Sequence, residues 1–141
     1  MSGYVTFVVE GRELASPLGA IREVVRAAGI EPLSGARAPV TGVLELRGLP
    51  VPVVDLRGPA DPGERGDVLI LETADGFVGV AVDRVLAVVS EEELVAVDAL
   101  VGGAFPAYVM QVRRHADRPG PVLVVSLAAL ASLPAGADQP R

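Results

Sequence analysis

Short apolar runs that are rich in Val and Leu recur along most of the chain, with a few charged residues among them. Such runs, separated by Gly, Pro and Asp residues, are typical of β-strands. A turn at Gly48 and Pro50 divides the segment 42–58 into two strands. The other predicted strands are residues 4–10, a return strand beginning at 14–15, and residues 67–73, 77–82, 85–89, 106–113 and 121–125. This spacing predicts a mostly β fold, either small barrels or a sandwich.

One segment after the first hairpin has a different period and predicts a helix. Ser16 suits an N-cap, Pro17 suits the first helical position, and Gly29 suits a C-terminal cap. Between them, apolar residues recur at helical spacing, at Leu18, Ile21, Val25 and Ala28. On this helix Glu23 lies opposite the apolar stripe.

Gly and Pro dominate residues 58–66, which form the clearest linker of the chain. The linker divides the strands into two sets, and each set is small for an independent core. We therefore expect two halves packed together in a single domain over residues 1–134, with strand exchange between the halves left open. A short helix at 126–133 is expected to close the fold, followed by a disordered tail at 135–141.

The composition argues against several kinds of functional site. The chain has 141 residues, half of them apolar and 4% aromatic, so Val, Leu, Ile and Ala must build the core. The absence of Cys excludes disulfides and cysteine metal sites. The net charge is −6 and every basic residue is Arg, which argues against nucleic-acid binding. No apolar run reaches the ~18 residues of a membrane span, and no signal-peptide pattern is present, so we expect a cytoplasmic protein without membrane insertion.

Asp55 and Asp83 are the only pair of carboxylates that suggests catalysis, because two close carboxylates can share a proton. Neither lies in the Asp-Thr/Ser-Gly loop of small aspartic proteases. The residues favour a structural role instead, in which each aspartate binds turn amides or pairs with Arg. A small acidic hydrolase using Asp55 and Asp83 remains a remote alternative.

His115 is the only histidine, and with no Cys available no metal site is expected. We predict that His115 is a solvated residue of the loop between the last two strands. The nearby Arg113, Arg114 and Arg118 have only Tyr108 as an aromatic neighbour, which favours a solvated hairpin tip over a nucleic-acid site. The serines and glycines match no nucleophile elbow or phosphate loop, so we expect neither an enzyme nor a cofactor.

Four motifs occur in a characteristic order. They are Phe7–Gly11, Leu14–Pro17 leading into Ile21–Val25, the pair Gly-Val-x-x-Leu-Arg-Gly at 42–48 and Val-Pro-Val-Val-Asp-Leu-Arg at 51–57, and Val78–Val85. Together they resemble the CheW-like domain, the coupling protein of bacterial chemotaxis arrays. The resemblance covers about residues 4–133.

The resemblance implies two five-stranded β-barrels that share a hydrophobic interface, and a scaffold without catalytic activity. Its implied partners are chemoreceptor tips and the regulatory domain of the histidine kinase CheA. The matched Arg47 is implicated in receptor contact, and the matched Glu23 lies in the same region. Arg47 either pairs with Glu23 across the barrel or one of the two reaches a partner. Val24, near the edge of the predicted helix, is a candidate apolar anchor.

The chain departs from the family pattern at Glu45, where Asn usually precedes Leu-Arg-Gly. In a strand Glu45 and Arg47 point the same way, so we expect Glu45 to neutralise Arg47 in part. Ser126 replaces the usual Asp before the final helix and still suits an N-cap. A divergent CheW-like module of another two-component system, one governing pili or development, is the main alternative.

Overall fold

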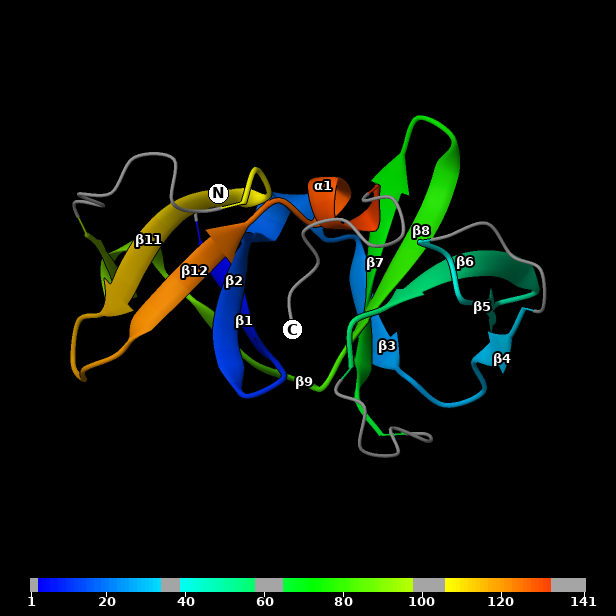
Figure 1. Cartoon of the computed structure of the whole chain (residues 1–141), viewed down its shortest axis with the longest axis horizontal. Helices are drawn as coiled ribbons and strands as arrows, with labels where there is room; N and C mark the ends of the chain where they lie inside the picture. Colours follow the sequence, from blue (N-terminus) through cyan, green and yellow to red (C-terminus); the bar gives the residue numbers. More distant parts are fainter. Residues whose placement is uncertain (1–2, 34–38, 58–64, 98–105, 133–141) are drawn as a thin grey trace.

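The computed structural model describes residues 3–33, 39–57, 65–97 and 106–132. These residues form two curled six-stranded sheets that lie side by side as two lobes (Figure 1). The first sheet has the order β10-β11-β12-β2-β1-β9 and the second has the order β3-β7-β8-β6-β5-β4. The first sheet contains β1 (Tyr4–Val9), β2 (Arg12–Pro17), β9 (Arg84–Val89), β10 (Leu94–Ala96), β11 (Val109–His115) and β12 (Pro121–Val125). The second contains β3 (Glu23–Arg26), β4 (Glu31–Pro32), β5 (Gly42–Leu46), β6 (Leu49–Asp55), β7 (Asp67–Thr73) and β8 (Gly76–Val82).

The two sheets have the same pairing pattern. Each has an end strand beside a tight hairpin, β1–β2 in the first sheet and β5–β6 in the second. The second strand of that hairpin then pairs in parallel with β12 or β8. A further antiparallel pair and a second end strand complete each sheet. The hairpins β1–β2 and β5–β6 therefore hold equivalent positions.

The chain passes between the sheets after β2 and again at Asp83, between β8 and β9. The segment 58–66 instead connects β6 and β7 of the same sheet, so the division of the strands predicted at this linker is wrong. The first sheet takes its strands from both ends of the sequence, and strands are thus exchanged between the two halves of the chain. The expected tail at 135–141 lies outside the described residues.

The central strands are buried on both faces, which explains their unbroken apolar sequences. In β7, Val68 and Ile70 face the interior of the second sheet, whereas Leu69 and Leu71 belong to the core between the sheets. The interior of the first sheet contains Tyr4, Ala15, Leu94, Val122 and Val124. The core between the sheets includes the fully buried Phe7. This core draws residues from both lobes, so the two sheets pack against each other.

The helix predicted after the first hairpin is wrong. Only Leu18–Ala20 form a 3-10 turn, η1, and β3 follows it and pairs with β7. Ser16 caps no helix: it is buried in β2, and its hydroxyl donates to the carbonyl of Pro17. The adjacent β-branched Val24 and Val25 favour a strand, and β7 offers a hydrogen-bonding edge.

The expected count of five strands in each barrel is also not what the structure has. The short strands β4 and β10 extend the second and first sheets to six. At the C-terminal end, α1 (Leu127–Ala131) begins after Ser126, whose Oγ accepts from the amide of Ala129 at 3.2 Å. The predicted cap and short helix are therefore confirmed for the residues described.

Candidate functional site

The turn between β5 and β6 projects Arg47 from the second sheet. Leu46 pairs with Leu49, so Arg47 and Gly48 form a two-residue turn, with φ angles of 48° and 84°. Positive φ at both central positions is the requirement of a type I′ hairpin turn, which matches the twist of the strands. Residues other than Gly rarely adopt this backbone conformation. The turn leaves the Arg47 side chain 70% exposed.

Arg47 pairs with Glu23 of β3. This pairing was one of the two alternatives that the family resemblance left open. Arg47 Nη1 donates to Glu23 Oε2 at 3.2 Å, and Nη2 donates to Oε1. The strand β3 lies at one end of the second sheet and the β5–β6 hairpin near the other, so the pair joins the two ends of the curled sheet. The hydrogen bond from Arg47 lowers the pKa of Glu23 below its ordinary 4.5, and the same bond raises the pKa of Arg47.

Val24 and Glu45 flank this pair. Val24 is 41% exposed on the end strand β3, beside Glu23. Glu45 is exposed on β5, opposite Pro50. We expected Glu45 to neutralise Arg47 in part because alternate residues of a strand point the same way. Arg47 lies in the turn and not in the strand, so that expectation does not apply to it. Within the described part of the chain, Arg47 makes its ion pair with Glu23 and none with Glu45.

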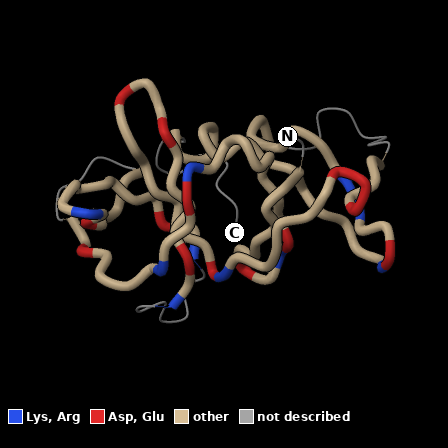
Figure 2. The backbone as a smooth tube through the Cα atoms, turned by 180° about the vertical axis from the view of Figure 1, so that it is seen from behind, with Lys and Arg blue, Asp and Glu red and all other residues tan. Residues whose placement is uncertain are grey.

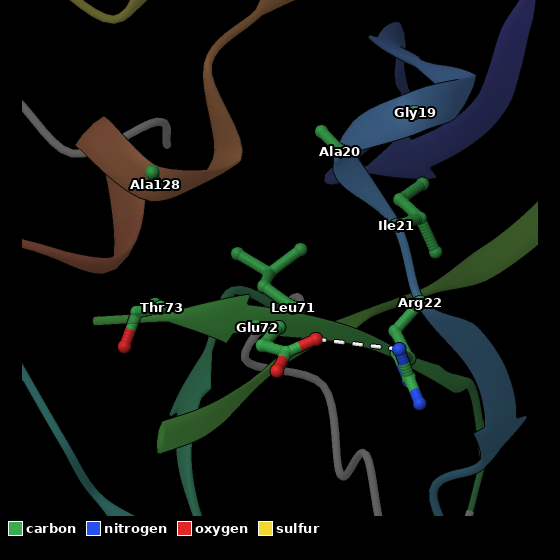
Figure 3. A pocket seen from close by; sticks show the side chains of 8 residues that line it. All are labelled: Gly19, Ala20, Ile21, Arg22, Leu71, Glu72, Thr73 and Ala128. Atoms are coloured by element: carbon green, nitrogen blue, oxygen red, sulfur yellow. Dashed lines mark hydrogen bonds and ion pairs between the residues drawn. The ribbon is translucent and has the colours of Figure 1, made fainter. Parts of the chain in front are cut away.

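A groove of about 690 Å³ lies between η1, β7 and α1 and was not predicted from the sequence. Figure 3 shows the η1 segment and α1 on its two sides, with β7 between them. Its lining residues come from three distant segments: Gly19, Ala20, Ile21, Arg22, Leu71, Glu72, Thr73 and Ala128. The groove thus combines apolar walls with one pair of charges.

The charged residues of the groove are Arg22 and Glu72, whose side chains pair at 3.3 Å. The Arg22 guanidinium also lies over the ring of Phe77, 5.8 Å from its centroid. Arg22 is next to Glu23 in sequence, and its charge contributes to the lowered pKa of Glu23. Arg22 therefore connects the groove, which it lines, with the Arg47–Glu23 pair, whose carboxylate feels its charge.

A second surface with exposed apolar side chains lies on the first sheet. Val95 and its neighbour Val97 are each 37% exposed, and Met110 of β11 is 59% exposed. On the other end strand, β9, Leu86 and Val88 are exposed. Charged positions do not gather into one basic region: Figure 2 shows acidic and basic residues interspersed along the described backbone.

Asp55 and Asp83 each have a structural partner. Asp55 accepts from the Arg57 backbone amide at 2.9 Å and from Arg57 Nη2 at 2.7 Å. This pair raises the pKa of Arg57, whose side chain is 6% exposed. Asp83 Oδ2 accepts from the amide of Glu10 at 2.6 Å. The interpretation of both aspartates as ligands of turn amides and Arg is confirmed.

The prediction of a solvated His115 is wrong. The strand β11 continues to His115, which pairs with Leu94 of β10 and is 7% exposed. The predicted loop was too long because the three-residue β10 had not been found. Arg113 lies in β11, within the predicted strand at 106–113, and its guanidinium lies over the ring of Tyr4, 5.2 Å from the centroid.

Among the described residues, no three His, Asp or Glu side chains are grouped so that they could hold a metal ion. In the same part of the chain, none of the helices has the length and apolar character that crossing a membrane requires.

Comparisons with known proteins place this geometry in context. The family model of the CheW-like domain matches residues 3–134. The fold is similar to the crystal structure of the scaffolding protein TtCheW from Thermoanaerobacter tengcongensis, with a TM-score of 0.70 at 21% sequence identity. The match covers 89% of this chain and 84% of that chain. No curated protein matches the chain.

Proposed function

The chain belongs to the CheW-like domain family, and we propose that it is a cytoplasmic chemotaxis adaptor that couples chemoreceptors to the histidine kinase CheA. The observation that carries the proposal is the exposed Arg47–Glu23 pair, with Val24 and the groove-lining Arg22 on either side of Glu23 in the sequence. These residues bring charged and apolar side chains together near the end strand β3 of the second sheet. Such a combination suits recognition of another protein.

The proposed occupant of the groove is the helical tip of a chemoreceptor. Ile21 and Leu71 supply apolar walls for the apolar face of a helix, and Val24 is a further exposed apolar residue on β3. Arg47 and Glu23 form the charged rim. Binding of an amphipathic helix in a groove typically combines apolar anchors of this kind with a polar rim.

The proposed surface for the regulatory domain of the kinase is a strand edge. End strands have unpaired backbone groups on one side, and exposed apolar side chains beside them favour docking of another sheet. In the first sheet, β10 offers Val95 and β9 offers Val88 for such a contact. Two separate surfaces on the two sheets are what an adaptor needs in order to bridge two partners.

Reconstitution of the purified protein with CheA and a receptor fragment tests this proposal. We expect phosphorylation of the kinase to become dependent on the receptor when the adaptor is added. The mixture without the adaptor is the control. A kinase activity that does not respond to the receptor at any adaptor concentration would contradict the proposal.

A divergent CheW-like module of another two-component system is a second candidate, and Glu45 favours it. This carboxylate is exposed on β5, next to the proposed receptor surface, where the family pattern has Asn. It would repel an acidic receptor segment. Under this candidate, the chain binds the kinase but does not bind chemoreceptor tips, and Glu45→Asn restores receptor binding.

A further inference from the structure

The only histidine of the chain lies in a charged cluster at the end of the first sheet. The His115 side chain is 8% exposed at the end of β11. Its Nε2 atom is 2.8 Å from Oε2 of Glu13 in β2. The same Nε2 atom is 2.9 Å from Nη2 of Arg118 in the turn between β11 and β12.

These two contacts of Nε2 exclude each other as hydrogen bonds. A carboxylate only accepts and a guanidinium only donates, whereas Nε2 either carries a proton or offers a lone pair. With a proton, Nε2 donates to Glu13 and its N–H faces the N–H of Arg118. Without one, Nε2 accepts from Arg118 and its lone pair faces the carboxylate of Glu13. The protonation of His115 therefore selects its partner.

Arg118 is the member of the cluster that is free to move. Its side chain is 58% exposed, whereas that of Glu13 is 21% exposed. Arg118 Nη2 also lies 3.8 Å from Glu13 Oε1, so the guanidinium keeps a contact with the carboxylate when it leaves the ring. The exposed guanidinium of Arg118 is therefore the group of the cluster with the most room to shift when the ring changes its partner.

The cluster borders a hollow of about 400 Å³ beside β9. Leu86, Ala87 and Val89 line its apolar side. Charged groups surround His115 and the hollow on each neighbouring element. Glu13 of β2 and Arg118 of the turn reach the ring, and Arg114 of β11 donates to the His115 carbonyl oxygen. The hollow is also lined by Asp117 of the turn and by Glu92 and Glu93 of η2 (Glu91–Glu93). The position of Arg118 therefore sets the charge at the rim of this hollow.

We propose that His115 is a proton-operated selector between Glu13 and Arg118. Protonation makes Nε2 a donor, so the ring binds Glu13 and releases Arg118 to the rim of the hollow. Deprotonation lets Nε2 accept from Arg118 and holds the guanidinium against the ring. The device lies on the first sheet and does not depend on receptor binding at the second.

Long-range ¹⁵N NMR of the imidazole tests this proposal directly, because a single histidine gives one set of ring signals. In the unmodified protein we expect Nε2 to be an unprotonated acceptor of Arg118 when the ring is neutral and a protonated donor to Glu13 when the ring is charged. In Arg118→Ala, only Glu13 remains, so Nε2 stays protonated in both states of the ring. In Glu13→Ala, the neutral ring is unprotonated at Nε2 and accepts from Arg118.

Arg114→Ala is the matched control, because it removes a neighbouring arginine that contacts the His115 carbonyl oxygen. We expect its Nε2 atom to have the same protonation pattern as in the unmodified protein. A neutral ring protonated at Nε2 in the unmodified protein would overturn the proposal, and so would the same neutral tautomer in Arg118→Ala and Glu13→Ala. Backbone amide spectra report folding. If Glu13→Ala does not fold, the spectrum of Arg118→Ala tests the proposal by itself. This substitution is at an exposed side chain, and the proposal requires it to change the tautomer of His115.

Discussion

The turns β1–β2 and β5–β6 hold equivalent positions in the two sheets and share one backbone conformation, yet their surroundings differ. The φ angles are 49° and 80° at Glu10 and Gly11, and 48° and 84° at Arg47 and Gly48. The amide of Glu10 donates to Asp83 at the point where the chain crosses between the sheets. Arg47 instead extends to Glu23 and stays exposed.

This difference separates a structural turn from one that is available to a partner. The β1–β2 turn is fixed from both sides of the crossing, because the Asp83 amide also donates to the carbonyl of Val8 at 3.0 Å. Beyond the pairing of its own hairpin, the β5–β6 turn is tied to β3 through the side chains of Arg47 and Glu23. Loss of the first set of contacts should reduce stability, whereas loss of the second should reduce binding.

The largest expected effect concerns the core that both sheets share. Phe7→Ala removes a fully buried ring from this core and should lower the free energy of unfolding by about 3–5 kcal/mol. Amide exchange should speed up in both sheets together. Urea denaturation and hydrogen exchange measure this, with the exposed Val88→Ala as the control. Faster amide exchange in the first sheet alone would contradict a core shared by both sheets.

A smaller effect is expected at the crossing between the sheets. Asp83→Ala leaves the Glu10 amide without its carboxylate acceptor and should lower the free energy of unfolding by about 1–3 kcal/mol. Asp75→Ala, in an exposed turn of the second sheet, is the matched control and should change little. Equal urea midpoints for Asp83→Ala and the unmodified protein would mean that the β1–β2 turn is not fixed structurally.

The smallest effect concerns the titration of Glu23. Arg47 lowers its pKa, so the ion pair adds stability above the ordinary pKa of 4.5, and this is lost as the pH falls through the lowered value. The ¹³C signal of the Glu23 carboxyl group should therefore titrate at a higher pH in Arg47→Ala than in the unmodified protein. Identical titration midpoints would show that the pair does not persist in solution.

Most strands could be predicted because their sequences contain unbroken Val and Leu runs bounded by Gly, Pro or Asp. The predicted strands at 67–73 and 121–125 have the bounds of β7 and β12. The segment from Glu23 to Arg26 was predicted as helical because its apolar residues also fit a 3.6-residue period. Pairing with β7 decided its conformation, and that contact lies more than 40 residues away in the sequence.

The candidate site could be predicted in part. Arg47 was expected near the surface because Gly48 follows it, and the family resemblance connected it with Glu23. The groove could not be predicted, because its walls are brought together from η1, β7 and α1. His115 was placed in a loop since a three-residue strand such as β10 has too short a pattern to detect.

Co-sedimentation of the purified protein with a chemoreceptor fragment and CheA tests the central claim most directly, namely that the β5–β6 turn serves binding. We predict that Arg47→Ala weakens receptor binding and leaves kinase binding and the urea midpoint unchanged. Arg84→Ala, an exposed arginine of the first sheet, should retain receptor binding. Unchanged receptor binding by a folded Arg47→Ala protein would contradict the account.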